Sequence, residues 1–520
     1  MKSRLFHIGL ILVLGLIFLS TYAQNAYSQN RVNILEADQI IGGTVEGKRV
    51  QKILGNVHLQ SEDFEMFCDS AYQFVNESEI RAYGNIQINT EDEKIWTDSL
   101  TYFTDVDFSQ LRGRVIIEAD STTLFGNSVD YRFSTKVAHF IDQIRLEDKD
   151  GILKADSGFY YREPDSATFR GEVQLSDTTQ YIEGDSLFSN RSTDYYELYG
   201  DIYANDKENN TLLKGNYLEA DSTGRRYLKG NAWLRNVKTD TVRTDSSVAD
   251  TLSPKPSADT TLARSDSLTA LPDSIRFTQR EPEIKSDTTH IRSKEILLLK
   301  QQTQPDTTTI INAYQDVRIW SNKFSSVSDT AKYNDALEMF ELWSNPKAWH
   351  NNIQLTGPYI KVILEDGDIH QLISYTDVFV AQEDTVLNRI NQLKGDTLNT
   401  YFTDGEISRM RLNGNTHILR FTKDEAGDPD GALDSTAPTS IFYFENGELV
   451  EFRHLGAIEG DFLPESQSLS NRKLDGYSWN PKQRPTRPEE KMEPRFPPIP
   501  DERPFELPRR YQAHIQTKNN

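Results

Sequence analysis

The stretch Ile80-Arg-Ala-Tyr-Gly-Asn-Ile-Gln-Ile88 decides the fold class of this chain. Small or apolar residues alternate in it with polar or aromatic ones, which is the period-2 pattern of a strand with one buried and one solvated face. The same pattern recurs at Ile53-Leu-Gly-Asn-Val-His-Leu59, Leu111-Arg-Gly-Arg-Val-Ile-Ile117, Phe169-Arg-Gly-Glu-Val-Gln-Leu175, Leu198-Tyr-Gly-Asp-Ile-Tyr-Ala204 and Leu228-Lys-Gly-Asn-Ala-Trp-Leu234. The glycines are 29 residues apart, twice 29 across one gap that Phe140, Asp142, Ile144 and Leu146 fill, and 30 at the end.

A second phrase accompanies each copy. About fifteen residues before each glycine, a small residue precedes Asp or Asn: Ala37-Asp38, Cys68-Asp69, Thr97-Asp98, Gly126-Asn127, Ala155-Asp156, Gly184-Asp185 and Gly215-Asn216. We interpret this phrase as a turn, so that each unit of about 29 residues holds two strands and two turns. Units of this length cannot bury a face alone and stack into a continuous core.

Composition narrows the class further. The 520 residues include 23 Tyr and 25 Phe, and the periodic segments are rich in Ile, Val, Thr and Tyr, which favours strands. No convincing helical run follows the N-terminal segment. The net charge of −22 argues against a nucleic-acid partner and against passive adhesion to an anionic membrane, because both need a basic face.

The N-terminus has the features of a secretory signal peptide. Lys2 and Arg4 precede an apolar run from Leu5 to Leu19, and small residues stand before a cleavage point after Ala23. The alternative is an uncleaved anchor helix, for which fifteen apolar residues are short. The single cysteine, Cys68, rules out a disulfide framework within the chain and is expected to be a small buried residue.

Beyond residue 23 the composition divides the chain into four parts. Residues 24–236 carry seven copies of the unit, and residues 289–463 continue the repeat in weaker form. Between them, residues 237–288 are rich in Thr, Asp, Ser and Pro and are predicted to be a disordered insertion, because they cannot bury enough apolar surface to order themselves. The Pro-rich residues 464–520 are predicted to be an extended, poorly ordered tail.

Neither catalysis nor metal binding is indicated. The repeated acid is replaced by Asn127 and Asn216 without other change, so a hydrogen-bond acceptor that caps backbone N–H groups explains it better than a metal ligand. No zinc-protease, nucleophile-elbow or phosphate-loop motif occurs. Acidic residues are too common here to single out a carboxylate pair. We therefore expect no enzyme activity, no metal and no cofactor.

The recurrent glycine lies on the apolar face of its strand. Such a glycine marks a sharp bend or a close backbone approach, and its repetition would crease the sheet along a line. A creased antiparallel sheet is an open V or a flattened roll with an aliphatic interior. The residues alone leave two alternatives, an ordinary filled core and a groove with spare room.

The two phrases together resemble the OstA/LptA-like periplasmic lipopolysaccharide-transport family. The matching phrases are Leu35-Glu-Ala-Asp38 with Gly55-Asn-Val57, Met66-Phe-Cys-Asp69 with Gly84-Asn-Ile86, and Leu153-Lys-Ala-Asp156 with Gly171-Glu-Val173. The acidic insertion and the C-terminal segments look like the large OstA-like proteins of Bacteroidetes-type bacteria. The resemblance implies an all-β, repetitive antiparallel β-jellyroll, or β-taco, with a V-shaped groove.

The resemblance also implies a function. The chain is expected to bind lipopolysaccharide through its lipid A part in the periplasm, in association with the outer membrane, and to act as a transport bridge that shields acyl chains. Expected partners are other OstA-like or Lpt transport components, which pair with an edge strand, or further copies of this chain joined end to end. The alternative is a non-catalytic structural scaffold or adhesin in outer-membrane assembly. The residues implied to contact lipid are Val57, Leu59, Ile86, Ile88, Val115, Ile117, Val173, Leu175 and Ile202.

Four positions depart from the pattern. Asp142 stands on the expected inward face, and Gln315, Ser344 and Thr376 replace the glycine. At these positions the crease is in doubt on sequence grounds.

Overall fold

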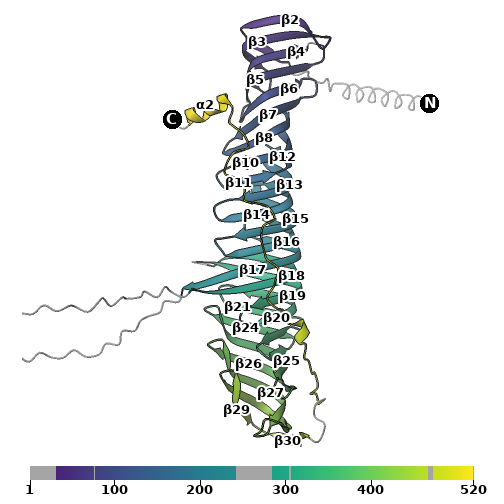
Figure 1. The fold of residues 1–520 in the computed structure, drawn as a ribbon, viewed down its shortest axis with the longest axis vertical. Helices are drawn as coiled ribbons and strands as arrows, with labels where there is room; N and C mark the ends of the chain where they lie inside the picture. The colour runs from purple at the N-terminus through teal and green to yellow at the C-terminus, as the bar shows by residue number, and fades with distance from the viewer. Residues whose placement is uncertain (1–30, 75, 242–283, 304–305, 466–471, 519–520) are drawn as a thin grey trace, which may run out of the picture.

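The described part of the chain is one antiparallel sheet of 30 strands, stacked along a single long axis (Figure 1). The computed structural model describes residues 31–518, except for 75, 242–283, 304–305 and 466–471. Most successive strands pair through short hairpins and are neighbours in the stack (Figure 1). Where the crease interrupts a strand, its two halves pair with a common neighbour, as β9 and β10 do with β8. This architecture confirms the predicted all-β repeat.

The strands before the insertion are β1 (Asn33–Glu36), β2 (Gln39–Val45), β3 (Lys48–Gln60), β4 (Glu65–Phe74), β5 (Glu79–Asn89), β6 (Glu93–Phe103), β7 (Phe108–Ala119), β8 (Thr122–Arg132), β9 (Val137–Asp142), β10 (Ile144–Glu147), β11 (Ile152–Ala155), β12 (Ser157–Tyr161), β13 (Ser166–Ser176), β14 (Gln180–Asn190), β15 (Tyr195–Asp206), β16 (Thr211–Ala220) and β17 (Arg226–Thr241). A short 3-10 helix, η1 (Arg191–Thr193), joins β14 to β15.

The strands after the insertion are β18 (Ile284–Thr303), β19 (Asp306–Ser321), β20 (Ser325–Asn334), β21 (Met339–Trp343), β22 (Lys347–His350), β23 (Ile353–Thr356), β24 (Tyr359–Glu365), β25 (Asp368–Asp384), β26 (Arg389–Thr403), β27 (Glu406–Lys423), β28 (Pro429–Glu445), β29 (Glu448–Leu455) and β30 (Glu459–Pro464). The C-terminal segment adds a 3-10 turn, η4 (Pro481–Gln483), and one α-helix, α2 (Arg509–Lys518).

A crease bends the sheet near the midpoint of its strands. In β5 two successive residues, Gly84 (φ +77°) and Asn85 (φ +44°), adopt the left-handed conformation. The strand ladder shifts register at this point. Glycine reaches this conformation without a steric cost, whereas most other residues do not. The predicted crease is therefore present, and it is made by a pair of residues.

The repeated acid packs against the glycine of the following strand. Asp69 stands in the middle of β4, and a Cβ added at Gly84 would lie 2.5 Å from its Oδ2. The same carboxylate accepts a hydrogen bond from Asn85 Nδ2 at 2.7 Å. The predicted role of the acid as a cap for backbone N–H groups in a turn is wrong, because its carboxylate accepts a hydrogen bond from a side chain and stands within a strand. The acid lies at the crease of the alternate strand, where its side chain occupies the space that the glycine leaves.

The crease also persists where glycine is absent. Gln315, Ser344 and Thr376 all have φ between +63° and +64°, and each is followed by a second left-handed residue. The expectation that the crease is in doubt at these positions is wrong, because all three residues adopt the left-handed conformation without being glycine. Asp142 is exposed instead of facing inward, and its Oδ1 accepts a hydrogen bond from Ser128 N at 2.9 Å.

The crease divides every long strand into two halves that belong to two facing walls. One wall, which we name the covered wall, contains half-strands such as Val57–Gln60 and Ile86–Asn89. The other, the bare wall, contains half-strands such as Ile80–Tyr83. The hairpin turns of both walls form the edge opposite the crease, which we name the mouth. Inward side chains of both walls join one apolar cluster that runs from Ile53 to Phe442.

The predicted boundaries of the insertion and of the second repeat region can be compared with the strands. Residues 237–241 continue β17 and residues 284–288 begin β18, so the ends of the predicted disordered insertion are strands. The rest of that insertion and the predicted signal peptide (1–23) lie outside the described residues. The second repeat region, predicted at 289–463, corresponds to β18 through β30.

The predicted disorder of the C-terminal segment differs from the structure. Residues 472–518, which we name the tail, run back along the stack from β28 towards β5, where α2 lies (Figure 1). The tail is mostly extended, as its prolines favour, but it is packed against the covered wall, where Leu474, Met492 and Tyr511 are buried. Its partners lie many repeats away in the sequence, and α2 is a helix that the repeat pattern does not predict.

We expect Thr376→Gly to stabilise the protein by about 1 kcal/mol, because a β-branched residue is strained in the left-handed region. Thr376 is exposed, so few contacts are lost with its side chain. Thermal and denaturant unfolding of the purified chain would measure the change. An unchanged or lowered stability would contradict backbone strain at Thr376.

A matched pair of glycine variants separates backbone strain from crowding. Gly405 (φ +79°) has nothing within 4 Å of an added Cβ, whereas Gly84 meets Asp69. Gly84→Ala should therefore lower the unfolding temperature more than Gly405→Ala. Equal effects would mean that the contact between acid and glycine contributes nothing.

Candidate functional site

The nine predicted lipid-contact residues lie together on the inner face of the covered wall. Eight of them are buried in the apolar cluster, and the ninth, Leu175, is partly buried against it. Their order along the stack follows their order in the sequence. The prediction of an inward apolar row is thus met in position, while contact with lipid stays a prediction.

The nine predicted lipid-contact residues leave out the facing half of this interior. The inner face of the bare wall contributes its own row of apolar side chains, and these meet the covered-wall row across the interior: Ile53, Ala71, Ala82, Leu100, Leu111 and Val129. They precede the glycine or follow the acid in the repeat, so their alternation is visible in the sequence. Only the crease reveals that they face the other row.

The interior is filled along most of its length. Inward residues such as Ile88, Val115 and Ile202 have essentially no exposed surface, and gaps of about 10 to 20 Å³ are found near Ala204, Phe442 and Leu355. These volumes hold at most a water molecule. In the described residues the filled core, one of the two alternatives that the sequence left, is therefore the resting state of most of the stack.

One larger cavity opens between the walls at the mouth, near the middle of the stack. Its volume is about 490 Å³, within the roughly 300–1,000 Å³ of small-ligand pockets. Leu234 and Ile291 line it from the covered wall, and Leu298, Ile311 and Phe340 line it from the bare wall. The strands here, β17 to β19, are 16 to 20 residues long and overhang their neighbours, which deepens the space between the walls.

Ion pairs close the mouth before this cavity. In each pair a cation on the bare wall meets an acid on the covered wall: Lys136 with Asp92 (2.9 Å), Arg162 with Asp120, Arg191 with Asp148 (3.2 Å) and Arg226 with Asp206 (3.3 Å). Aromatic rings add to the closure at the N-terminal end, where Phe64 packs on Phe133 with ring centres 4.2 Å apart. A hydrogen bond from Tyr131 to the buried Glu93 joins the walls, and burial raises the pKa of Glu93.

Beyond the cavity the cations lie on the covered wall and the acids on the bare wall. Lys238 on the covered wall reaches Asp335 (3.3 Å) and Glu338 (3.0 Å) on the bare wall. Partial burial opposes its charge, but Tyr333 and these two acids raise the pKa of Lys238 overall. Lys323 meets Asp368 across the mouth in the same sense. The cavity is bounded by Arg226 on one side and Lys238 on the other.

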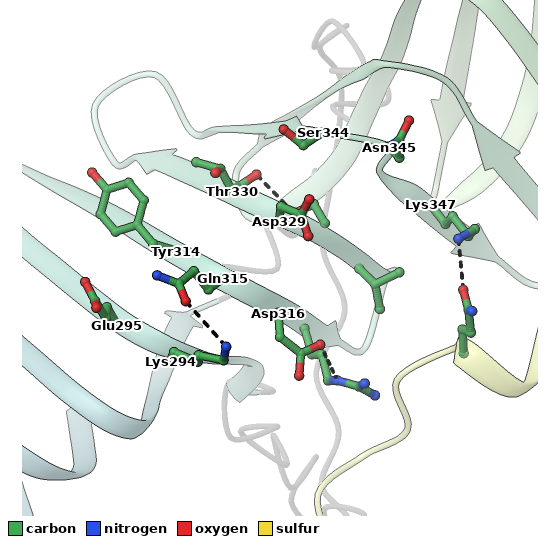
Figure 2. Close-up of a pocket in the computed structure, with 14 residues that line it drawn as sticks. Lys294, Glu295, Tyr314, Gln315, Asp316, Asp329, Thr330, Ser344, Asn345 and Lys347 are labelled. Carbon is green, nitrogen blue, oxygen red and sulfur yellow. Dashed lines mark hydrogen bonds and ion pairs between the residues drawn. The ribbon is translucent and has the colours of Figure 1, made fainter.

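A larger recess of about 1,070 Å³ lies on the outside of the crease (Figure 2). It is lined by charged and polar side chains from β18 to β22, with Lys294, Asp316, Asp329 and Lys347 among them (Figure 2). Lys294 donates to Gln315 Oε1 at 3.4 Å, and Lys347 donates to Gln483 of the tail at 2.9 Å. This recess is lined mainly by polar and charged side chains, so the smaller cavity between the walls suits an acyl chain better.

The outer face of the covered wall is a binding site for the tail. Two buried glutamines on it, Gln354 and Gln392, each pair with the tail backbone as a strand would. Gln392 Nε2 donates to Arg472 O (3.0 Å), and its Oε1 accepts from Leu474 N (2.8 Å). Gln354 repeats this arrangement with Ser478 O (3.0 Å) and Asn480 N (2.7 Å).

Buried charged groups continue the contact along the wall. The Glu183 carboxylate, which has no exposed surface, accepts hydrogen bonds from the backbone N–H groups of Arg495 (2.6 Å) and Phe496 (3.2 Å). Arg145 donates to the carbonyl oxygens of Pro500 and Asp501. Buried polar groups need such partners, because an unpaired one costs about 1–3 kcal/mol. The covered wall is thus complete only with the tail in place.

Apolar anchors of the tail fill three outer patches. Tyr511 of α2 packs on Trp96, Ile116 and Phe125, and Met492 packs on Trp233. Leu474 packs with Phe379 and Phe421 in a third patch. The other buried members of this patch are Ala381, Leu387, Leu419 and Ala432. A signal for this surface exists in the sequence. At Ile95-Trp96 and Val115-Ile116-Ile117 consecutive residues are apolar, which breaks the alternation expected of a strand with a solvated face.

A histidine lies in the outer face close to the tail. Trp233 Nε1 donates to His290 Nδ1 at 3.1 Å, and the ring of Trp320 is 5.6 Å from the imidazole. Burial, together with Arg235, Arg292 and Arg487, lowers the pKa of His290 to about 4. The imidazole is therefore neutral at pH 7 and acts as a hydrogen-bond acceptor. Cys68 is equally inert, because burial raises the pKa of its thiol to about 12.

The described residues contain no group of three or more His, Cys, Asp or Glu side chains placed to hold a metal ion. In this part of the chain no helix has the length and apolar character needed to span a bilayer.

The creased stack with a continuous apolar interior defines a repetitive β-taco protein. Residues 29–185 match the family model described as OstA-like protein, which supports in this region the resemblance seen in the repeated phrases. No curated protein matches the chain.

We expect Glu183→Ala to release the middle of the tail, because two backbone N–H groups lose their buried acceptor. A loss of about 1–3 kcal/mol per acceptor corresponds to roughly 10- to 100-fold faster amide exchange at Arg495 and Phe496. Hydrogen exchange followed by mass spectrometry would measure it. Glu197→Ala is the matched control, since Glu197 bonds to Tyr195 and Tyr199 on the bare wall. Unchanged exchange at 495–496 would contradict the role of Glu183.

The stability of the chain should fall as the pH drops from about 6.5 to about 4, in part through His290. The unfolded histidine takes up its proton near pH 6.5, whereas the folded one resists it until about pH 4. In this window the unfolded state binds more protons, so the free energy of unfolding decreases as the pH falls. His290→Gln should flatten this dependence in unfolding measurements. A pH profile identical to that of the wild type would rule out this contribution.

Proposed function

We propose that this protein binds the lipid A part of lipopolysaccharide and carries it towards the outer membrane, with acyl chains shielded between the two walls. The observation that carries the proposal is the uninterrupted apolar cluster between the walls from Ile53 to Phe442. Apolar surface of this extent, continuous along a stack, suits a ligand with long acyl chains. The OstA-like match over residues 29–185 supports a role in lipopolysaccharide transport.

The ends of the stack support assembly with partners of the same fold. Among the described residues, β2 pairs only with β3, and β30 pairs only with β28, so each leaves one edge open. Large apolar side chains are exposed at both ends, including Ile40 (55%) at one and Val450 (54%) and Phe462 (53%) at the other. An open edge with exposed apolar residues favours strand addition by another chain. Partners would be other OstA-like or Lpt components, or further copies of this chain.

A location in the periplasm, in association with the outer membrane, follows from this function and from the predicted signal peptide. The protein would act without catalysis and without a cofactor, because binding and shielding need neither. The second candidate is a non-catalytic scaffold or adhesin for outer-membrane assembly. The filled interior favours it, because a scaffold requires no room for lipid.

Photo-crosslinking distinguishes the two. A photoreactive residue at Leu298, which lines the cavity, should form an adduct with lipopolysaccharide in cells. The same residue at the adjacent Leu297, which points out of the bare wall, should not. An adduct at 298 alone would establish lipid in the interior. No adduct at either position, in a folded and exported protein, would favour the scaffold.

A further inference from the structure

In the described residues, the cavity between Arg226 and Lys238 marks the point where the arrangement of ion pairs across the mouth changes. Before it, four successive pairs join bare-wall cations to covered-wall acids, and after it the sense is reversed. At the cavity the cations change from the bare wall to the covered wall. The two bounding cations, Arg226 and Lys238, come from opposite walls.

At the cavity the apolar interior approaches solvent from the side, as it also does at Leu146 (7%), Ala204 (8%) and Ile353 (9%). Leu298, Ile311 and Tyr333 each retain 8% of their surface, whereas inward residues of the earlier repeats, such as Ile88 and Val115, retain none. Leu234, Ile291 and Phe340 line the cavity and belong to the same apolar cluster as the nine covered-wall residues. An acyl chain inserted here would contact the continuous interior without passing along the stack from an end.

The Lys238 side chain bridges the two walls across the opening of the cavity. Its ammonium group spans from the covered wall to Asp335 and Glu338, and it lies 5.7 Å from the centre of the Tyr333 ring. The side chain is one-third exposed, so water can replace its partners readily. The closed mouth before the cavity is different, because consecutive ion pairs and the packed rings of Phe64 and Phe133 would have to separate together.

We propose that this cavity is a lateral port through which an acyl chain of an amphiphile enters the interior, with Lys238 as the bar that closes it. The head group of the amphiphile stays at the rim, where the cations Arg226, Lys238 and Lys300 stand among six acidic side chains, Asp206, Glu208, Asp287, Asp335, Glu338 and Asp366. This inference rests on the proposed lipid function and adds a point of entry to it. Entry at the middle of the stack would leave both end strands free for partners.

Reversible bridging of the mouth tests the port. Cysteines at Lys238 and Glu338, joined by a short, reducible bismaleimide, would hold the opening closed, and a photoreactive residue at Leu298 would report loading with purified lipid A. Bridging should lower the loading rate at least tenfold, and reduction should restore it. The native Cys68 is fully buried and does not compete for the reagent.

Two further bridges distinguish the outcomes. A bridge between positions 92 and 136 joins the walls in the closed part of the mouth, and a bridge between 112 and 130 joins neighbouring strands on the outer bare wall. Both should leave loading within about twofold of the unbridged protein. Equal inhibition by the 92/136 bridge would show that the whole mouth parts, and loading that survives the 238/338 bridge would show entry from an end. Either result overturns the port.

A different result would show that the protein does not bind lipid A at all. If unbridged protein forms no adduct with lipid A at Leu298, the lipid function is overturned and the port with it. Lys238→Gln provides an independent measurement on a variant without a bridge. It should load several-fold faster than the wild type, whereas Lys136→Gln should load at the wild-type rate. An unchanged rate for Lys238→Gln would show that this side chain is no bar.

Discussion

The whole architecture depends on the contact between an acid on one strand and a left-handed glycine on the next. The Asp69 side chain fills the space beside Gly84, and the glycine makes that space available because it has no Cβ. Repeated along the stack, this contact turns one antiparallel sheet into two facing walls. Both walls then bury a single continuous core, and the hairpins are gathered at one mouth. Rungs without glycine keep the same bend, as at Thr376, where a threonine adopts the left-handed conformation.

Much of the fold could be predicted from the sequence, because strand alternation and a 29-residue period are local and repetitive. The inward row of the covered wall, including Ile86 and Val115, was predicted for the same reason. The cavity was not, since it depends on how far β17 to β19 overhang their neighbours. The tail was predicted to be disordered because its composition is rich in proline and charge. Its order depends on partners such as Glu183, which is over 300 residues away from Arg495.

The mouth shows how an acidic protein organises its charge. The ion pairs are arranged by wall, with cations on the bare wall in the first half and on the covered wall in the second. Isolated surface pairs contribute little, typically about 0–1 kcal/mol each. A row of them, backed by ring packing and by the bond from Tyr131 to Glu93, closes one stretch of the mouth as a unit. The filled interior beneath implies that any ligand must displace side-chain contacts as it enters.

The tail links repeats that lie far apart in the stack. A stack of repeats normally senses only its nearest neighbours, so its stability is a sum of local terms. Here one segment touches repeats near both ends, from Gln392 to Trp96, and ties distant repeats into one cooperative unit. The residues made last cover the repeats made first. A growing chain therefore keeps the aromatic outer face of its earliest repeats uncovered until synthesis is almost complete, and a chain that ends early never covers it.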